Sequence, residues 1–139
     1  MCSGGTVTVN EVMVVEPYSY LMHIACKVFG KLTPHKTVWD LLKACFPAGI
    51  VSRTPTIGTM ETIHKLGPCR RGLYSGVYVY YDFERQLNSA IAIRTMVANN
   101  NTVSVQVGTR LVVDSEPEKK YEEALNKAKG LLEAIRCLY

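Results

Sequence analysis

The sequence has few features of a secreted, membrane-spanning or metal-binding protein. Its 5 cysteines are scattered along 139 residues without a CxxC pair and share no ligand spacing with the 3 histidines. This usage argues against a disulfide framework and against a zinc site. The start, MCSGGTVTVN, has neither a basic stretch nor an apolar run, so no signal peptide is predicted. No apolar run approaches the ~18 residues of a membrane span. We therefore expect a cytoplasmic chain with reduced thiols and no membrane contact.

Strong positive charge is also missing. The formal charge is +4 and the isoelectric point is about 8.8, below the value of about 9 or more that is typical of nucleic-acid-binding domains. Tyr78, Tyr80 and Tyr81 could form a base-stacking platform near Arg70 and Arg71. However, tyrosines in a strand usually pack across strands. We therefore expect no nucleic-acid partner.

The chain is long and apolar enough to form one domain. Hydrophobic residues make up 47% of its 139 residues, so a single domain over 1–139 is predicted, which in principle could bury its own core. Residues 6–16 and 20–32 predict paired antiparallel strands, the second of them mostly buried. Residues 72–83, 89–98 and 102–113 predict a three-stranded antiparallel meander.

Helical patterns separate and follow these strands. Thr37 is expected to cap a short helix that Pro47 ends, and a second helix is expected over 57–65. A long helix over 116–136 is expected to begin at a capping box of Ser115 and Glu118 and to lay an apolar stripe on the sheet. The predicted fold class is therefore α+β, an antiparallel sheet with helices packed on one face.

Several motifs, taken in order, resemble the C-terminal part of the chorismate-utilising enzymes. They are FPAG at 46–49, RRGLYSG at 70–76, IAIRT at 91–95, and VQVG with the charged tail from 105 to 135. The tail is most similar to that of anthranilate synthase component I. The resemblance implies a partial chorismate-binding domain that lacks the N-terminal half of the family's catalytic domain. In that family Mg²⁺ helps to hold chorismate, and a glutamine amidotransferase subunit supplies ammonia.

The resemblance also assigns roles to single residues. Arg94 corresponds to an arginine that clamps a substrate carboxylate, which a planar guanidinium suits; the alternative is an exposed strand arginine paired with an acid. Tyr74 and Gly108 correspond to substrate contacts, although a strand glycine can also mark a bulge. His23 corresponds to a catalytic histidine near the departing ring hydroxyl, or is a core residue. Lys127 is expected to bind substrate as well.

The segment FPAGIVSRTPTIGTME departs from the family pattern FPAGTVSGAPK. Ile50 replaces a threonine, Arg53 a glycine, Thr54 an alanine and Thr56 a lysine. An arginine in place of a glycine adds bulk where free φ and close approach were available. Arg110 also replaces a family glycine. We expect a filled loop, in which Arg53 and Arg110 fill the cavity, face solvent or form new contacts to an anion.

The long helix departs from the family as well. The family has acids at the positions of both Lys120 and Glu123, a spacing that lets two carboxylates face one magnesium ion. Because the ammonium of Lys120 repels a metal, Glu123 is expected to hold Mg²⁺ weakly. The row Glu116, Lys120, Glu123 and Lys127 alternates in charge, and each neighbouring pair is expected to stabilise the helix by about 0.2–0.5 kcal/mol.

Three functions remain open at this point. By resemblance, the chain converts chorismate and ammonia to anthranilate and pyruvate in tryptophan biosynthesis, but only with a complementary chain that supplies the missing half. An exposed apolar sheet face is expected in that case. Alternatively, the chain is a catalytically dead relative that binds a partner subunit or a small anion, or a fragment without activity. Independent turnover is not expected.

Overall fold

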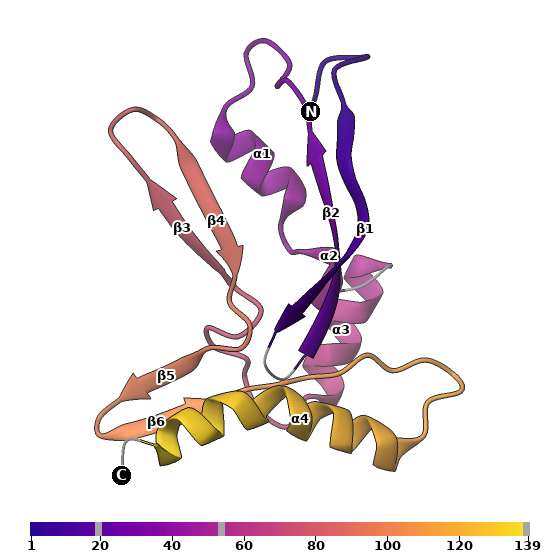
Figure 1. Ribbon diagram of the computed structural model, residues 1–139, viewed down its shortest axis with the longest axis vertical. Coiled ribbons are helices and arrows are strands. Elements are labelled where there is room, and N and C mark those ends of the chain that lie inside the picture. The colour runs from indigo at the N-terminus through magenta and orange to yellow at the C-terminus, as the bar shows by residue number, and fades with distance from the viewer. Residues whose placement is uncertain (19–20, 53–54, 138–139) are drawn as a thin grey trace.

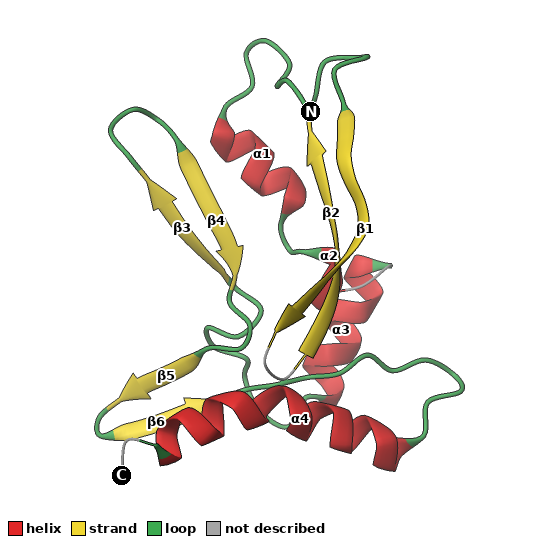
Figure 2. Ribbon diagram, viewed as in Figure 1, coloured by secondary structure: helices red, strands yellow, loops and turns green. Residues whose placement is uncertain are grey.

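The computed structural model describes residues 1–18, 21–52 and 55–137, which form an α+β fold as predicted (Figure 2). The strands are β1 (Thr8–Tyr18), β2 (Leu21–Phe29), β3 (Val77–Tyr81), β4 (Leu87–Ile91), β5 (Met96–Asn99) and β6 (Thr102–Val105). The helices are α1 (Val38–Cys45), α2 (Gly49–Ser52), α3 (Thr56–Leu66) and α4 (Pro117–Arg136). Strands β1 to β4 extend toward one end of the molecule, and α4 lies with β5 and β6 at the other end (Figure 1).

Strands β1 and β2 form an antiparallel hairpin, and their predicted pairing is confirmed. Lys27 and Glu11 face each other across it, with 2.9 Å between Lys27 Nζ and Glu11 Oε1. The expected burial of the second strand is wrong, because Met22, Ile24 and Val28 are 74%, 65% and 60% exposed. A two-stranded ribbon buries little apolar surface by itself. Its apolar side chains therefore remain exposed to solvent in this chain.

The predicted three-stranded meander is wrong, and two separate hairpins stand in its place. Within the described residues the strands pair as β1–β2, β3–β4 and β5–β6, each pair forming its own sheet. The expected middle strand is broken between β4 and β5. There Ala92 N donates a hydrogen bond to Gly76 O at 2.9 Å, and Ser75 N donates to Ala92 O at 2.9 Å. Two residues later Arg94 has a left-handed backbone, with φ of 51°, which redirects the chain so that β5 begins a new sheet.

Helices α1 and α3 are present where the sequence predicts them, whereas the short helix α2 was not expected. Thr37 caps α1, as predicted. Its Oγ1 accepts a hydrogen bond from Asp40 N at 3.2 Å, and Thr37 N donates to Asp40 Oδ2 at 2.9 Å. This reciprocal pair is a capping box, which satisfies two backbone donors at the start of the helix. Trp39 of α1 contacts Tyr81 of β3, with 5.1 Å between ring centroids.

Helix α4 has the predicted extent but not the predicted start. The capping box expected from Ser115 and Glu118 is wrong, because Ser115 Oγ accepts a hydrogen bond from Val112 N at 2.8 Å and so serves the preceding turn. The charge row also begins differently. Glu116 pairs with Lys119 at 2.8 Å rather than with the lysine one position further on.

Few side chains are buried in the described chain, although its length and composition would in principle allow a core of its own. Among the described residues, the buried ones are Ala92, Ala128 and Ser52. The apolar stripe of α4 is only partly covered, since Tyr121, Leu125 and Leu132 are 67%, 48% and 44% exposed. The exposed apolar surface also includes the β1–β2 hairpin. Monomers rarely leave large apolar patches open to water, so these exposed side chains mark surface that further polypeptide could cover.

Candidate functional site

A cavity of about 540 Å³ brings together elements that are far apart in the sequence. It is lined by His23 of β2, Tyr74 of the turn before β3, Arg94 of the β4–β5 link, Gly108 of the segment after β6, and Lys127 of α4. These are the residues that the sequence predicts as substrate contacts or as the catalytic group. The fold thus places them around one space.

The rest of the cavity wall combines cationic and apolar side chains. Arg71 and Arg110 join Arg94 and Lys127 in the lining, and no Asp or Glu of the described chain lies among the lining residues. The apolar part comes from Ile50, Val51, Ile63, Ile93 and Leu111. Such a wall suits a ligand that carries negative charge on an apolar frame.

Tyr74 and Gly108 are in close contact across the cavity wall. A Cβ at position 108 would lie 2.9 Å from the hydroxyl oxygen of Tyr74, closer than side chains tolerate. The backbone φ of Gly108 is not in the left-handed range, so the approach of Tyr74, rather than the backbone conformation, requires glycine here. The alternative of a glycine that marks a strand bulge does not apply, because Gly108 lies outside the described strands.

Arg71 contacts the ring of Tyr74. Its guanidinium carbon lies 5.6 Å from the centroid of the Tyr74 ring, within the range of a cation–π contact. Arg71 Nη1 also donates hydrogen bonds to Ser75 Oγ at 3.1 Å and to Val51 O at 3.4 Å. The sequence prediction missed Arg71 as a site residue, although its position in the RRGLYSG motif beside Tyr74 was a usable signal.

Arg94 lines the cavity and has an uncommon backbone conformation. Its φ of 51° is rare for a residue with a Cβ and is associated with functional sites. It lies in the link between β4 and β5 rather than in a strand. No ion pair or hydrogen bond joins its guanidinium to another residue of the part of the chain that the structure describes. Its five N–H donors are therefore available for an anion in the cavity.

His23 contributes an imidazole to the β2 side of the cavity. It is half-buried and packs edge-on against the ring of Tyr18, with 5.8 Å between centroids and 74° between planes. Its strand partner across the hairpin is Glu16. The imidazole is thus oriented by an aromatic neighbour while it still reaches the cavity, so the alternative of an enclosed core histidine does not describe it.

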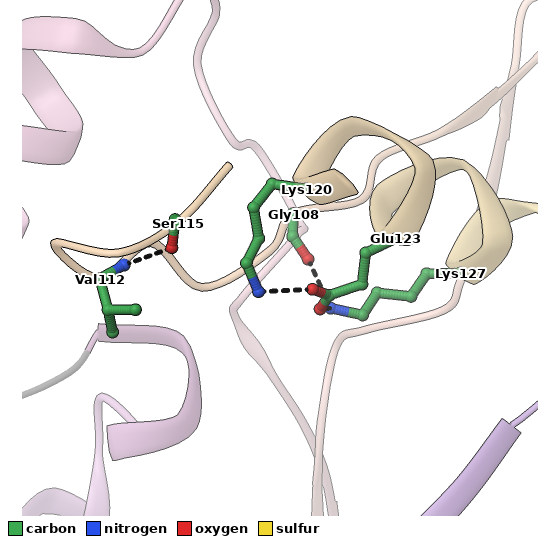
Figure 3. Close-up of polar contacts among 6 residues, drawn as sticks. All are labelled: Gly108, Val112, Ser115, Lys120, Glu123 and Lys127. Atoms are coloured by element: carbon green, nitrogen blue, oxygen red, sulfur yellow. Dashed lines mark hydrogen bonds and ion pairs between the residues drawn. The ribbon is translucent and has the colours of Figure 1, made fainter. Parts of the chain in front are cut away.

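Lys120, Glu123 and Lys127 form a charged network on α4 that reaches Gly108 (Figure 3). Lys120 Nζ donates to Glu123 Oε2 at 2.7 Å, and Lys127 Nζ donates to Glu123 Oε1 at 2.6 Å. Lys127 Nζ also donates to Gly108 O at 3.3 Å. The helix spacing of three and four residues places both ammonium groups on the face that carries the carboxylate.

This network stabilises the charged form of Glu123. The hydrogen bond from Lys120, followed by that from Lys127, lowers the pKa of Glu123 to about 2. The Thr109 hydroxyl adds a smaller lowering of the same pKa. Its oxygen is buried and makes no hydrogen bond of standard geometry within the described chain, so we interpret its effect as a loose contact with the carboxylate. Glu123 thus acts as the counter-ion of two lysines.

The described residues do not fit a magnesium site. Mg²⁺ requires near-octahedral coordination by oxygen and is usually held by one or two carboxylates. Here both oxygens of Glu123 are paired with ammonium groups. The part of the chain that the structure describes contains no group of three or more His, Cys, Asp or Glu side chains that could hold a metal ion.

One departure in the FPAG segment, Ile50 of α2, lines the cavity. Val51 of α2 and Thr59 and Thr62 of α3 line it as well, so these two helices form part of its wall. The hydroxyls of Thr59 and Thr62 donate to backbone carbonyls four residues earlier. Arg53 and Thr54 lie outside the described residues, whereas Arg110 is exposed and lines the cavity.

In the described ranges, no helix is both long and apolar enough to cross a membrane.

The chain is similar to known proteins over nearly its whole length. Residues 1–133 match the family model described as chorismate binding enzyme. The chain is 62% identical to anthranilate synthase component 1 of Synechocystis sp., covering 99% of this chain and 28% of that protein. It is 45% identical to the protein of the same name from Aquifex aeolicus, covering 94% of this chain and 26% of that protein.

Solved structures have the same fold. The crystal structure of anthranilate synthase component I from Streptococcus pneumoniae matches with a TM-score of 0.83 and 42% identity, over 89% of this chain and 28% of the other. A Bacillus anthracis protein described as a 2,3-dihydroxybenzoate-specific isochorismate synthase matches with a TM-score of 0.86 and 27% identity, over 96% and 36% of the two chains. The chain thus spans less than a third of the length of its curated relatives. With the family model matched over residues 1–133, this chain belongs to the chorismate binding enzyme family.

Proposed function

We propose that this chain forms one part of a chorismate-binding site of the anthranilate synthase component 1 type. In this proposal, conversion of chorismate and ammonia to anthranilate and pyruvate requires a second polypeptide that supplies the rest of the family's fold. A glutamine amidotransferase subunit is the proposed source of ammonia. The observation that carries the proposal is the single cavity that His23, Tyr74, Arg94, Gly108 and Lys127 line.

The chemistry of the cavity supports a dicarboxylate ligand. Chorismate carries two carboxylates on a partly apolar ring, and the cavity offers cationic side chains together with an apolar wall. A guanidinium can bind a carboxylate with two parallel hydrogen bonds, and the guanidinium of Arg94 makes no hydrogen bond or ion pair among the described residues. Lys127 can contact a second carboxylate as a point charge.

The exposed apolar surface supports the requirement for a second polypeptide. Ile24 and Val28 of β2, Leu125 and Leu132 of α4, and Phe83 of the β3–β4 turn are all exposed. The chain also spans only 28% of the Synechocystis relative. We therefore propose that the partner is a polypeptide equivalent to the remainder of that relative, which packs on this surface and encloses the cavity.

Complementation tests this proposal directly. The chain would be co-expressed with the part of the Synechocystis relative that lies outside the match, and the purified pair would be given chorismate and an ammonium salt. Fluorescence of the anthranilate product reports turnover. We expect product from the pair, none from either chain alone, and loss of product with Arg94→Ala.

A matched variant controls for the loss of positive charge. Arg136→Ala removes an arginine that pairs with Glu133 at the far end of α4, outside the cavity lining, and should leave turnover unchanged. A stable pair that does not bind chorismate would refute the proposal.

A second candidate is a non-catalytic module that binds an anion. The pairing of Glu123 with both Lys120 and Lys127 favours it, because a family metal ligand is already neutralised. In the same experiment, a pair that binds chorismate and forms no anthranilate would support this candidate over the enzyme.

A further inference from the structure

The side chains around Glu123 carry more positive than negative charge. Two ammonium groups face one carboxylate, so the Lys120, Glu123 and Lys127 network carries a net charge of +1 at neutral pH. The three side chains are 27%, 39% and 25% exposed, which leaves them partly shielded from water. Partial burial strengthens charge interactions relative to those in bulk solvent.

A divalent cation at this carboxylate would meet strong repulsion. Both oxygens of Glu123 accept hydrogen bonds from lysines at 2.6 and 2.7 Å. A metal ion would have to displace one ammonium group from a Glu123 oxygen. It would still lie within a few Å of the two positively charged lysine side chains. Among the described residues no Asp or Glu lines the cavity, so no other carboxylate there compensates for this repulsion.

The protein itself supplies the positive charge that an anion would need. Lys127 has three N–H donors, and two of them are directed to Glu123 and Gly108. The third remains for a ligand in the cavity. Lys120 pairs with Glu123 Oε2, so the carboxylate offsets only part of the charge of Lys127. Arg71, Arg94 and Arg110 add further positive charge around the same space.

We propose that the cavity binds its dicarboxylate ligand without a divalent cation, and that Lys120 is the positioning residue that makes this possible. This inference rests on the proposed function, because it concerns the same ligand at the same site. Lys120 does not line the cavity. It acts through Glu123 and leaves Lys127 free to meet the ligand.

Calorimetric titration with chorismate tests the proposal. The complemented pair described above, and the chain alone where it is folded, would be titrated in buffer with EDTA and in buffer with MgCl₂. For the unaltered chain we expect the same Kd in both buffers, within about twofold. For Lys120→Glu, which exchanges the ammonium for a second carboxylate, we expect binding in EDTA to weaken by about tenfold or more and Mg²⁺ to restore it.

Two control variants test whether the effect of Lys120→Glu depends on its position or only on the change of charge. Lys119→Glu makes the same charge change one residue earlier, at a lysine that pairs with Glu116 and is 72% exposed. This variant should show no dependence on Mg²⁺. Lys120→Arg, which keeps a positive charge beside Glu123, should behave like the unaltered chain.

A direct metal readout is independent of chorismate. Mn²⁺ broadens the NMR signals of nearby nuclei, so α4 amides should broaden in Lys120→Glu and not in the unaltered chain. Chorismate binding that fails in EDTA and returns with MgCl₂ in the unaltered chain would overturn the inference and leave the proposed function standing. Absence of chorismate binding in both buffers would refute the proposed function, and the inference with it.

Discussion

Tyr74 rests on Gly108 so closely that even one methyl group on the glycine would come within 2.9 Å of the tyrosine hydroxyl. The contact joins the turn before β3 to the segment between β6 and α4. Because Gly108 O also accepts a hydrogen bond from Lys127 at 3.3 Å, one glycine positions two groups of the proposed ligand site.

Gly108→Ala should therefore displace the Tyr74 ring and weaken chorismate binding by about tenfold or more, with a smaller effect on stability. Calorimetric titration measures the Kd, and the Tyr74 ring signals in NMR report the displacement. Gly58→Ala is the control, because a Cβ there meets only Pro55 Cγ at 4.0 Å. Because alanine favours a helix more than glycine does, Gly58→Ala in α3 should raise the free energy of unfolding by about 0.5–1 kcal/mol. Unchanged chorismate affinity in Gly108→Ala would contradict the proposed role of this contact.

Arg94→Gly should weaken chorismate binding without lowering the stability of the fold. Glycine adopts positive φ without the clash of a Cβ, so the substitution should leave the free energy of unfolding unchanged or raise it by up to about 1 kcal/mol. Chorismate affinity should fall sharply, because the guanidinium is lost. Urea titration and calorimetry measure the two quantities. Arg94→Lys retains the charge without the fork and should bind with intermediate affinity. A clear loss of stability in Arg94→Gly would show that the side chain has a structural role instead.

Lys120→Met should raise the pKa of Glu123 from about 2 toward 4.5, because it removes the hydrogen bond that contributes most to the lowering. A carboxyl whose pKa is lowered in the folded state adds stability above its unfolded pKa and loses that stability as pH falls. For Glu123 the loss runs from about 4.5 down to about 2. An NMR titration of the side-chain carboxyl carbon measures the shift, and Lys119→Met should leave it unchanged. An unaltered pKa in Lys120→Met would mean that Lys127 alone controls the carboxylate.

Ile24→Lys should prevent assembly with the complementary polypeptide while it leaves the chain's own contacts intact. Ile24 is 65% exposed on β2, so a lysine there remains hydrated in the free chain and would be buried in the pair. Size-exclusion chromatography of the co-expressed pair provides the measurement. Asn88→Lys adds the same charge at an exposed position of β4 and should assemble normally. Normal assembly of Ile24→Lys would place the partner surface elsewhere.

Local features of this fold could be predicted, because their causes lie within a few residues. Thr37 and Asp40 form the expected capping box at neighbouring positions, and the apolar runs of β1 and β2 pair as their pattern indicates. Ser115 shows where the same reasoning fails. Its hydroxyl had two possible backbone partners, and the bond to Val112 N prevails.

Longer-range features could not be predicted from pattern alone. The run that contains Ala92 and Arg94 reads as one strand, and only the left-handed backbone of Arg94 divides it between two sheets. The prediction that β2 is buried was wrong for a different reason. An apolar pattern indicates that a strand face is suited to packing, but it does not show which part of a polypeptide packs on that face. The motif residues His23, Tyr74, Arg94, Gly108 and Lys127 do line one cavity. Arg71 was missed although it lies in the RRGLYSG motif, because its contacts with the Tyr74 ring and with Val51 O are made only in the folded chain.

The division of the described strands into two-stranded sheets affects how the chain can aggregate. Every described sheet keeps both outer edges without a neighbouring strand, and such edges are templates for strand addition by any other chain. Copies of this chain could therefore add strands to one another's open edges. Early coverage of these edges during synthesis, by the remainder of the fold that the proposed function requires, should favour native assembly over aggregation.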